Sequence, residues 1–234
     1  MFRQETITGV TRDLSVAIDK YKAIIEKDPA AVKVCLSKGN SKIGKSMNFS
    51  IAPILTCGRR CKLCARYCYD IKACKQYPNN VIDARARNTA FAYVARDYLF
   101  NQIDAAMSRR RTNKTFRFHV AGDIIDLDYF SRMVDIAKKH PDFRVWTYTK
   151  QYEIVNEYCD KYGRNAIPNN FTIMFSEWKG AEMINPYSFP EFRVIFKGEK
   201  TPSDAKWICP GNCDICKQCN RGCLNNETTY AHEH

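Results

Sequence analysis

The stretch FRFHVAGDIIDLDYFSRMVDIAKKHPDFRVWTYTK, residues 116–150, contains a strand pattern, a helix pattern and a second strand pattern in succession. FRFHVA and FRVWTYT alternate in the manner of strands, whereas DYFSRMVDIAKKH has apolar residues at helical spacing and stops before Pro141. The series continues with a helix over QYEIVNEYCDKY, ended by Gly163, and with strands over FTIMFS and EFRVIF. Strands separated by helices predict parallel βαβ units, in an open sheet or in a full or partial barrel.

Upstream of this series, the sequence predicts two helical regions and one more strand. Residues 11–28 form an amphipathic pattern, and residues 81–108 form a longer one that Asn79 and Asn80 can cap. MNFSIAPIL, residues 47–55, alternates like a strand and runs directly into the first group of cysteines. We therefore divide the chain into an N-terminal helical segment (1–32), an α/β core (33–200) and a Cys-rich C-terminal segment packed on the core (201–234).

Chemically capable residues follow each expected strand. In parallel α/β architectures, ligands bind at the carboxyl ends of the strands, which share one edge. The residues expected at that edge are the first cysteine group, Gly122, Asp123, Tyr148, Lys150 and Ser176. His119, within FRFHVA, is a further candidate because its ring can act as an acid or a base near neutral pH.

The first cysteine group is CGRRCKLCARYCYDIKAC, residues 57–74. Its first three thiols, Cys57, Cys61 and Cys64, have the spacing C-x3-C-x2-C, which can hold three irons of a [4Fe–4S] cluster and leave the fourth open to a substrate. Cys68 and Cys74 either complete that cluster, which would close the open iron, or bind another metal. The residues from Cys57 to Lys75, inclusive, contain six Lys or Arg, which can offset thiolate charge.

The second cysteine group, CPGNCDICKQCNRGC, spans residues 209–223. Its last four thiols have the C-x2-C-x2-C-x3-C spacing of bacterial ferredoxins. Zinc is the alternative metal, but zinc sites usually draw on two separated pairs of ligands rather than on runs of five. The predicted ligands here are Cys209, Cys213, Cys216, Cys219 and Cys223.

Two other patterns suggest different chemistry. GNSKIGKS, residues 39–46, satisfies the P-loop consensus, but the following MNFSIAP is strand-like where a phosphate-binding loop needs a helix. A Ser176–His119–Asp123 hydrolase triad lacks the G-x-S-x-G sequence around its serine. We expect neither a nucleotide site nor this triad.

The C-x3-C-x2-C loop after the first strand resembles that of the radical S-adenosylmethionine (SAM) superfamily, with Leu63 in place of the usual aromatic residue. In that superfamily an acidic motif at the end of the second strand meets the methionyl amino group, and Ala121-Gly122-Asp123 is similar to it. The resemblance implies an α/β fold with a partial or compact (β/α) barrel like the radical SAM core, carrying a Cys-rich metal-binding tail. Ser176 joins Gly122 and Asp123 as a candidate cofactor-binding residue.

A second resemblance covers residues 36–225. Gly39-Asn40, Cys57 to Cys68, Gly122-Asp123 and Tyr148-Thr149-Lys150 resemble the motifs of the phage "gene product 88" type. This resemblance implies a phage origin, a location in the host cytoplasm and a functional role for these residues, but it names no reaction.

Composition sets the remaining expectations. The 234 residues, 45% of them hydrophobic, suffice for one substantial core. The N-terminus has no apolar signal region and no stretch approaches the roughly 18 apolar residues that span a bilayer, which predicts a cytoplasmic protein without a membrane partner. The net charge of +12 is compatible with nucleic acid as a partner.

Three functions follow as hypotheses. The first is a radical SAM-like enzyme with two [4Fe–4S] clusters, an unknown substrate and a host electron donor, in which Asp123 would hold the methionyl amino group. The second is a non-redox iron–sulfur hydrolase or hydratase that uses the open iron as a Lewis acid. Its candidate catalytic residues, as acid–base or oxyanion groups, are His119, Asp123, Tyr148 and Lys150. The third is a metal-stabilised protein without enzymatic activity that binds nucleic acid or a host factor.

Overall fold

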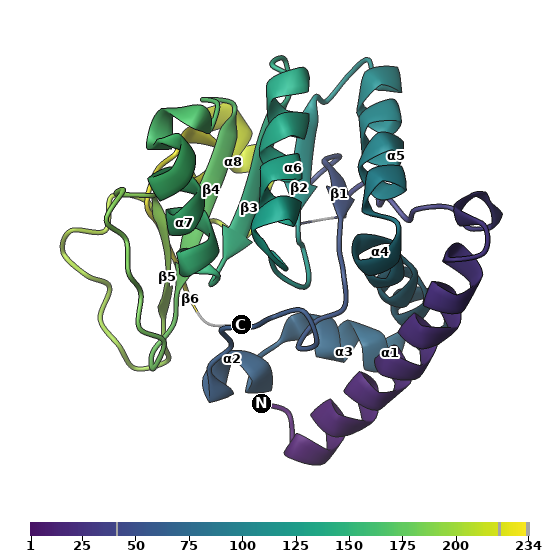
Figure 1. Ribbon diagram of the computed structural model, residues 1–234. Helices are drawn as coiled ribbons and strands as arrows, with labels where there is room; N and C mark the ends of the chain where they lie inside the picture. Colours follow the sequence, from purple (N-terminus) through teal and green to yellow (C-terminus); the bar gives the residue numbers. More distant parts are fainter. Residues whose placement is uncertain (41, 220, 233–234) are drawn as a thin grey trace.

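The strand patterns of the sequence assemble into a six-stranded parallel sheet in the computed structural model, which describes residues 1–40, 42–219 and 221–232 (Figure 1). The strands are β1 (Met47–Phe49), β2 (Thr115–Phe118), β3 (Arg144–Thr149), β4 (Phe171–Glu177), β5 (Glu191–Ile195) and β6 (Thr229–His232). They lie side by side in chain order, from β1 to β6. Doubly wound folds reverse direction within the sheet, and this order does not. The sheet is open, with β1 and β6 at its edges.

Helices cover one face of the sheet. Figure 1 shows α6 (Leu127–Lys139) and α7 (Tyr152–Tyr162) in front of the strands, α5 (Arg96–Arg109) to the side beyond β1, and α8 (Cys213–Cys219) behind the strands. The core under these helices is rich in aromatic side chains from alternate strand positions, including Phe49, Phe116, Phe118, Phe171 and Phe175. Each such side chain contributes roughly 1.5–3 kcal/mol when it is fully buried. This face is therefore the principal apolar core.

A second apolar cluster joins the N-terminal helix to the segment that follows β1. The helix α1 (Gln4–Ile25) packs against α3 (Tyr69–Gln76) and α4 (Asp83–Val94), and the short α2 (Lys62–Arg66) precedes α3. Leu14, at helical spacing from Val10 and Ile18, is fully buried in this cluster. The first cysteine group, which forms α2 and α3, is thus anchored on α1 and α4.

Most expected elements are confirmed, with differences at their ends. The region 81–108 is two helices, because Ala95 leaves helical geometry (φ −145°, ψ 55°) between α4 and α5. The residues expected to cap it lie within a π-helical turn, Pro78–Ile82. The C-terminal segment forms α8, the turn η4 (Gly222–Asn225) and then β6, which pairs with β5. Its last residues are therefore part of the sheet.

A buried ion pair fixes α3 to α4. Asp70 is 1% exposed and accepts two hydrogen bonds of 2.9 Å from the Arg85 guanidinium, one to each carboxylate oxygen. This bidentate geometry is the strongest form of the carboxylate–arginine contact. Because both charges are shielded from water, loss of either partner leaves the other unpaired.

We expect Asp70→Ala to lower the free energy of unfolding by about 3–5 kcal/mol, since it strands the Arg85 charge. Asp13→Ala is the matched control, because Asp13 pairs with Arg12 at the exposed surface of α1, and its cost should stay below about 0.5 kcal/mol. Urea unfolding followed by circular dichroism measures both values. Equal stability of the two variants would contradict the assigned role of this pair.

Candidate functional site

The chain leaves β1 and turns across the carboxyl end of the sheet before it reaches the first cysteine. The Ile51 amide donates to the Ala121 carbonyl at 3.1 Å, and the Ser50 hydroxyl accepts from the Ala121 amide at 3.2 Å. From the other side, the Asn88 side chain donates to the Ser50 carbonyl and the Thr89 hydroxyl accepts from the Ala52 amide. The position of the cysteine loop is thereby set by the end of β2 and by α4.

Gly122 is needed where this loop passes the end of β2. Its φ is +79°, and a Cβ at this position would lie 2.4 Å from Ile51 Cγ1 and 2.8 Å from Thr56 Oγ1. Any side chain would therefore push away the segment that leads to Cys57. Gly122 acts on the site by permitting this close approach.

Four thiols of the first group come within electrostatic range of one another. Burial, followed by the charges of Asp123, Cys68 and Cys64, raises the pKa of Cys57 to about 12. Burial, followed by the charges of Asp70 and Cys64, raises the pKa of Cys68 to about 11. Burial also raises the pKa of Cys64, while the Lys150 ammonium group acts in the opposite direction. The Cys61 sulfur accepts a hydrogen bond of 3.3 Å from the Cys64 amide at the start of α2. Cys64 is thus within electrostatic range of each of the other three thiols.

Cys74 is the most deeply buried thiol of the first group, although Cys68 is close enough to raise its pKa. It is fully buried in the apolar cluster of α1, α3 and α4, beside Ile71 and Ala86. Burial raises the pKa of its thiol to about 12. Its surroundings are those of a small core residue.

The ends of β2 and β3 meet at Asp123. Its buried carboxylate accepts from the Thr149 hydroxyl at 2.6 Å, from the Lys150 amide at 2.9 Å and from the Ile124 amide at 2.8 Å. Burial raises the pKa of Asp123, and these donors act in the opposite direction. Asp123 is also close enough to raise the pKa of Cys57. The carboxylate and the first thiol group therefore belong to one site.

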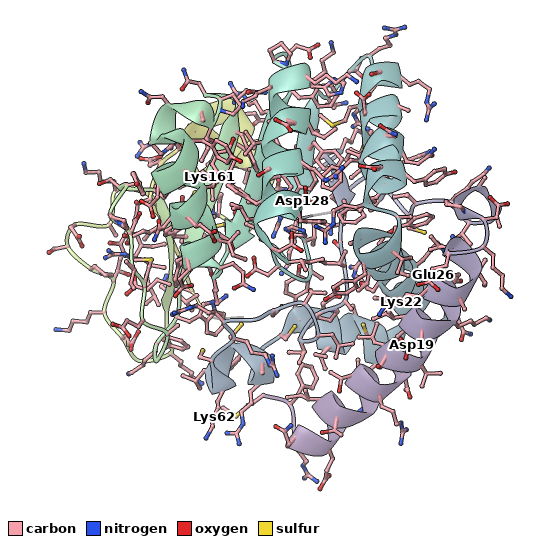
Figure 2. All side chains as sticks on the ribbon, in the orientation of Figure 1. Asp19, Lys22, Glu26, Lys62, Asp128 and Lys161 are labelled. Atoms are coloured by element: carbon pink, nitrogen blue, oxygen red, sulfur yellow. The ribbon has the colours of Figure 1, made fainter. Side chains whose placement is uncertain are left out.

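Lys150 connects β3 to β4 at the same edge. Its ammonium group donates to the Ser176 hydroxyl at 3.2 Å and lies 5.4 Å from the centre of the Trp178 ring. It also opposes the rise that burial causes in the pKa of Cys64. The predicted residues Asp123, Lys150 and Ser176 are thus brought together with the thiols. In Figure 2, the labelled Lys62 at the start of α2 extends away from this edge into solvent.

His119 faces the other way. Its φ of +52° turns the ring toward the helices, where Nε2 lies 3.0 Å from the Tyr129 hydroxyl and Nδ1 lies 3.4 Å from Thr147 Oγ1. The side chain is 2% exposed, and burial lowers its pKa to about 3. The structure therefore places His119 in the packed core, away from the thiols and Asp123.

The second cysteine group covers the face of the sheet opposite α6 and α7. The Tyr148 hydroxyl on β3 donates to the Cys223 sulfur at 3.0 Å. Burial and the nearby thiols of Cys209 and Cys213 raise the pKa of Cys223 to about 11. Cys216 is buried near Gly222. The Cys219 side chain lies outside the part of the chain that the structure describes.

The GNSKIGKS loop supports this second group. Its Lys42 carbonyl accepts from the Cys213 amide at 2.7 Å, and Gly44 packs closely against Asp214. The Lys42 and Ile43 amides donate to the Asn40 side chain. The loop leads into β1, as MNFSIAP predicts, and not into the helix that a phosphate-binding loop needs.

Metal ligation by either group goes beyond the observed geometry. No set of three or more His, Cys, Asp or Glu side chains within the described ranges has the mutual arrangement of a metal-ion site. Sequence reasoning included Thr149 in the Tyr148-Thr149-Lys150 strand end without giving it a role, and it missed Arg117.

Comparison with known proteins identifies a family but no activity. The model of the gene product 88 family matches residues 33–233. Neither the curated proteins nor the solved structures contain a significant match. None of the described helices combines the length and the apolar character needed to cross a bilayer.

The buried His119 predicts a loss of stability in acid. Its folded pKa of about 3 lies below the ordinary value of 6.5, so its contribution is complete above pH 6.5 and declines as the pH falls through that range. Between pH 7 and pH 4 this group alone should cost about 3 kcal/mol of unfolding free energy.

We expect His119→Asn, which tolerates a positive φ, to be less stable at pH 7 but to lose about 3 kcal/mol less on acidification. Urea unfolding at both pH values measures the difference. His232→Asn, at an exposed position, is the control and should follow the wild type. Parallel losses in the wild type and His119→Asn would exclude this origin of acid sensitivity.

Proposed function

This chain belongs to the gene product 88 family of phage proteins, and we propose that it is an iron–sulfur enzyme with a radical SAM-like site. The observation that carries the proposal is the position of the C-x3-C-x2-C loop. It follows β1 at the carboxyl edge of a parallel sheet in chain order, with Asp123 and Lys150 within electrostatic range of its thiols. In this interpretation the open sheet is a partial (β/α) barrel.

The donor set suits an iron–sulfur cluster. Soft thiolate ligands select iron–sulfur clusters, zinc or copper(I), and Cys57, Cys61 and Cys64 offer three of them from eight residues. Burial raises the pKa of Cys57 and of Cys64, and a bound cation would supply the charge that stabilises the thiolates. Cys68 lies within electrostatic range of Cys64 and would be the side chain that decides whether the fourth iron is closed. Cys74, in the apolar cluster, would not be a ligand.

A reduced cluster of this kind supplies the electron for cleavage of the sulfonium group of SAM. The chain's own residues would bind and orient that molecule. Asp123 Oδ1 already accepts two hydrogen bonds, but Oδ2 accepts one, so a lone pair remains for the methionyl amino group. The Lys150 ammonium and the Ser176 hydroxyl lie where they can bind a carboxylate. In this proposal the second group binds an auxiliary cluster through Cys209, Cys213, Cys216, Cys219 and Cys223.

The compartment follows from this chemistry. Thiol-bound clusters persist in reducing surroundings, so the proposal places the protein in the host cytoplasm, where a host protein would donate the electron.

Anaerobic purification with iron and sulfide analysis tests the metal. We expect about eight irons per chain for two [4Fe–4S] clusters. Cys57→Ala, Cys61→Ala and Cys64→Ala should each lose up to about half of the iron, whereas Cys74→Ala, the control in the same sequence run, should keep it. The reduced protein should show an EPR signal that SAM perturbs, and it should cleave SAM.

Three results would contradict parts of this proposal. Zinc without sulfide would exclude the iron–sulfur assignment. Clusters that neither respond to SAM nor cleave it would exclude the radical reaction, and hydrolysis of simple esters without reductant would then assign a Lewis-acid role to the iron. Loss of iron in Cys74→Ala would show that the apolar position of Cys74 is not its position in the loaded protein.

Nucleic-acid binding is a second candidate function, favoured by a basic surface at the opposite edge of the sheet. Two loops that precede β1 and β2 meet there, because the Arg110 guanidinium donates to the Lys45 carbonyl. Together they contribute seven basic residues: Lys38, Lys42, Lys45, Arg109, Arg110, Arg111 and Lys114. Five of them are exposed, and Lys114 pairs with Asp142. Such a surface can displace counterions from a phosphate backbone.

We expect a fluorescent DNA duplex to bind with an affinity that falls steeply with salt. The variant Lys42→Gln, Lys45→Gln, Arg111→Gln should lower the slope of log K against log[salt] by about 2–3, at roughly 0.9 per lost phosphate contact. The triple variant Lys20→Gln, Lys27→Gln, Lys161→Gln removes the same charge elsewhere and should keep most of the affinity. Equal losses in the two variants would point to net charge rather than to this surface.

A further inference from the structure

The face of the sheet between the two cysteine groups carries polar side chains. Parallel register places Asn48, Arg117, Trp146 and Thr172 in one row across β1 to β4. The neighbouring row contains Tyr148 and Met174. Parallel sheets packed on both faces are ordinarily apolar on both. The polar row therefore indicates that this face serves something other than apolar packing.

Arg117 is the charged residue of that row, and it lacks a counterion. Its Nε is buried without a hydrogen-bond partner, and no carboxylate of the described residues pairs with it. Its one close contact of known geometry is with the Tyr148 ring, whose centre lies 4.6 Å from the guanidinium carbon. An enclosed cation without a partner is unfavourable unless an anion joins it.

The aromatic neighbours hold the guanidinium in place. Tyr148 donates its hydroxyl to Cys223 and packs edge-to-face on Phe192 at 5.0 Å, so its ring is fixed from two sides. Arg117 lies over that fixed ring. Preorganisation of this kind lowers the entropy cost of binding a ligand.

Arg117 is only partly buried. Tyr69, the first residue of α3, is 53% exposed and lies within electrostatic range of the Arg117 guanidinium. Because Tyr69 directly follows Cys68 in the chain, Arg117 lies between the first thiol group and Tyr148.

We infer that Arg117 binds an oxyanion, the carboxylate or phosphate of a small-molecule substrate, in the space between the two cysteine groups. The planar guanidinium presents paired donors that match either oxyanion. For the enzyme, this inference rests on the proposed function, because it names the class of substrate at that site. The anion site itself can be tested without any reaction.

The test is calorimetric titration of the anaerobically purified protein with inorganic phosphate and, separately, with acetate, at constant ionic strength. We expect saturable binding of at least one anion, and the comparison of the two separates a phosphate from a carboxylate ligand. Arg117→Gln should abolish binding, and Arg117→Lys, which keeps the charge but loses the fork, should weaken it at least tenfold. Arg193→Lys, an arginine of β5 paired with Glu191 and Glu177, should bind as the wild type does.

Absence of saturable binding by the wild type, or wild-type affinity in Arg117→Lys and Arg117→Gln, would overturn the inference. Circular dichroism shows whether each variant is folded. If Arg117→Gln fails to fold, the anion affinity of Arg117→Lys decides whether the inference holds. Loss of iron in Arg117→Gln, with anion binding unchanged, would assign the guanidinium to the clusters and also overturn it. Anion binding that depends on Arg117 in a protein without iron would uphold it while refuting the proposed function.

Discussion

The buried carboxylate of Asp123 is the interaction on which the carboxyl edge of the sheet depends. It accepts hydrogen bonds from Thr149, Lys150 and Ile124, and so joins the ends of β2 and β3. A carboxylate away from water is costly unless such donors satisfy it. By fixing the backbone of Lys150, it also directs that side chain toward Ser176 on β4. The residues around the first thiol group therefore take their positions from one ionisable side chain.

The sequence was sufficient to predict this edge because its determinants are local. Alternation and helical spacing mark β2, α6, β3, α7 and β4, and the parallel arrangement then places their ends together. The strand β6 escaped prediction, since TYAH is short and has no periodicity of its own. It exists because β5 offers an unpaired edge, which is a property of the folded sheet. The break at Ala95 is similarly non-local, since neither proline nor glycine marks it.

The orientation of His119 shows how one backbone angle can invert a pattern. Extended geometry would put His119 on the same face as Arg117, two residues earlier. The strand ends at Phe118, and the positive φ of His119 returns its ring to the helix side. Histidine is among the residues that adopt this conformation more readily, but the sequence alone does not announce it. The polar face thereby loses its expected acid–base group and keeps an arginine.

The ten clustered cysteines differ in the residues against which they pack. Ile71 and Cys74 are three residues apart on α3, which puts both toward α1, and this spacing was the available sign that Cys74 belongs to the core. A basic residue of the first run also stabilises the cysteine loop, because the Arg60 guanidinium donates hydrogen bonds to the carbonyls of Ile54 and Cys57.

The second cysteine run is placed by contacts with Lys42 and Tyr148, far away in the sequence. Spacing could therefore group the thiols of each run, but only the packing shows that Tyr148 and Arg117 lie between the two runs. One thiol group opens at the carboxyl edge, and the other covers the polar face. Arg117 lies over Tyr148, which contacts the second group, and within electrostatic range of Tyr69, which follows Cys68, so its charge bears on both groups.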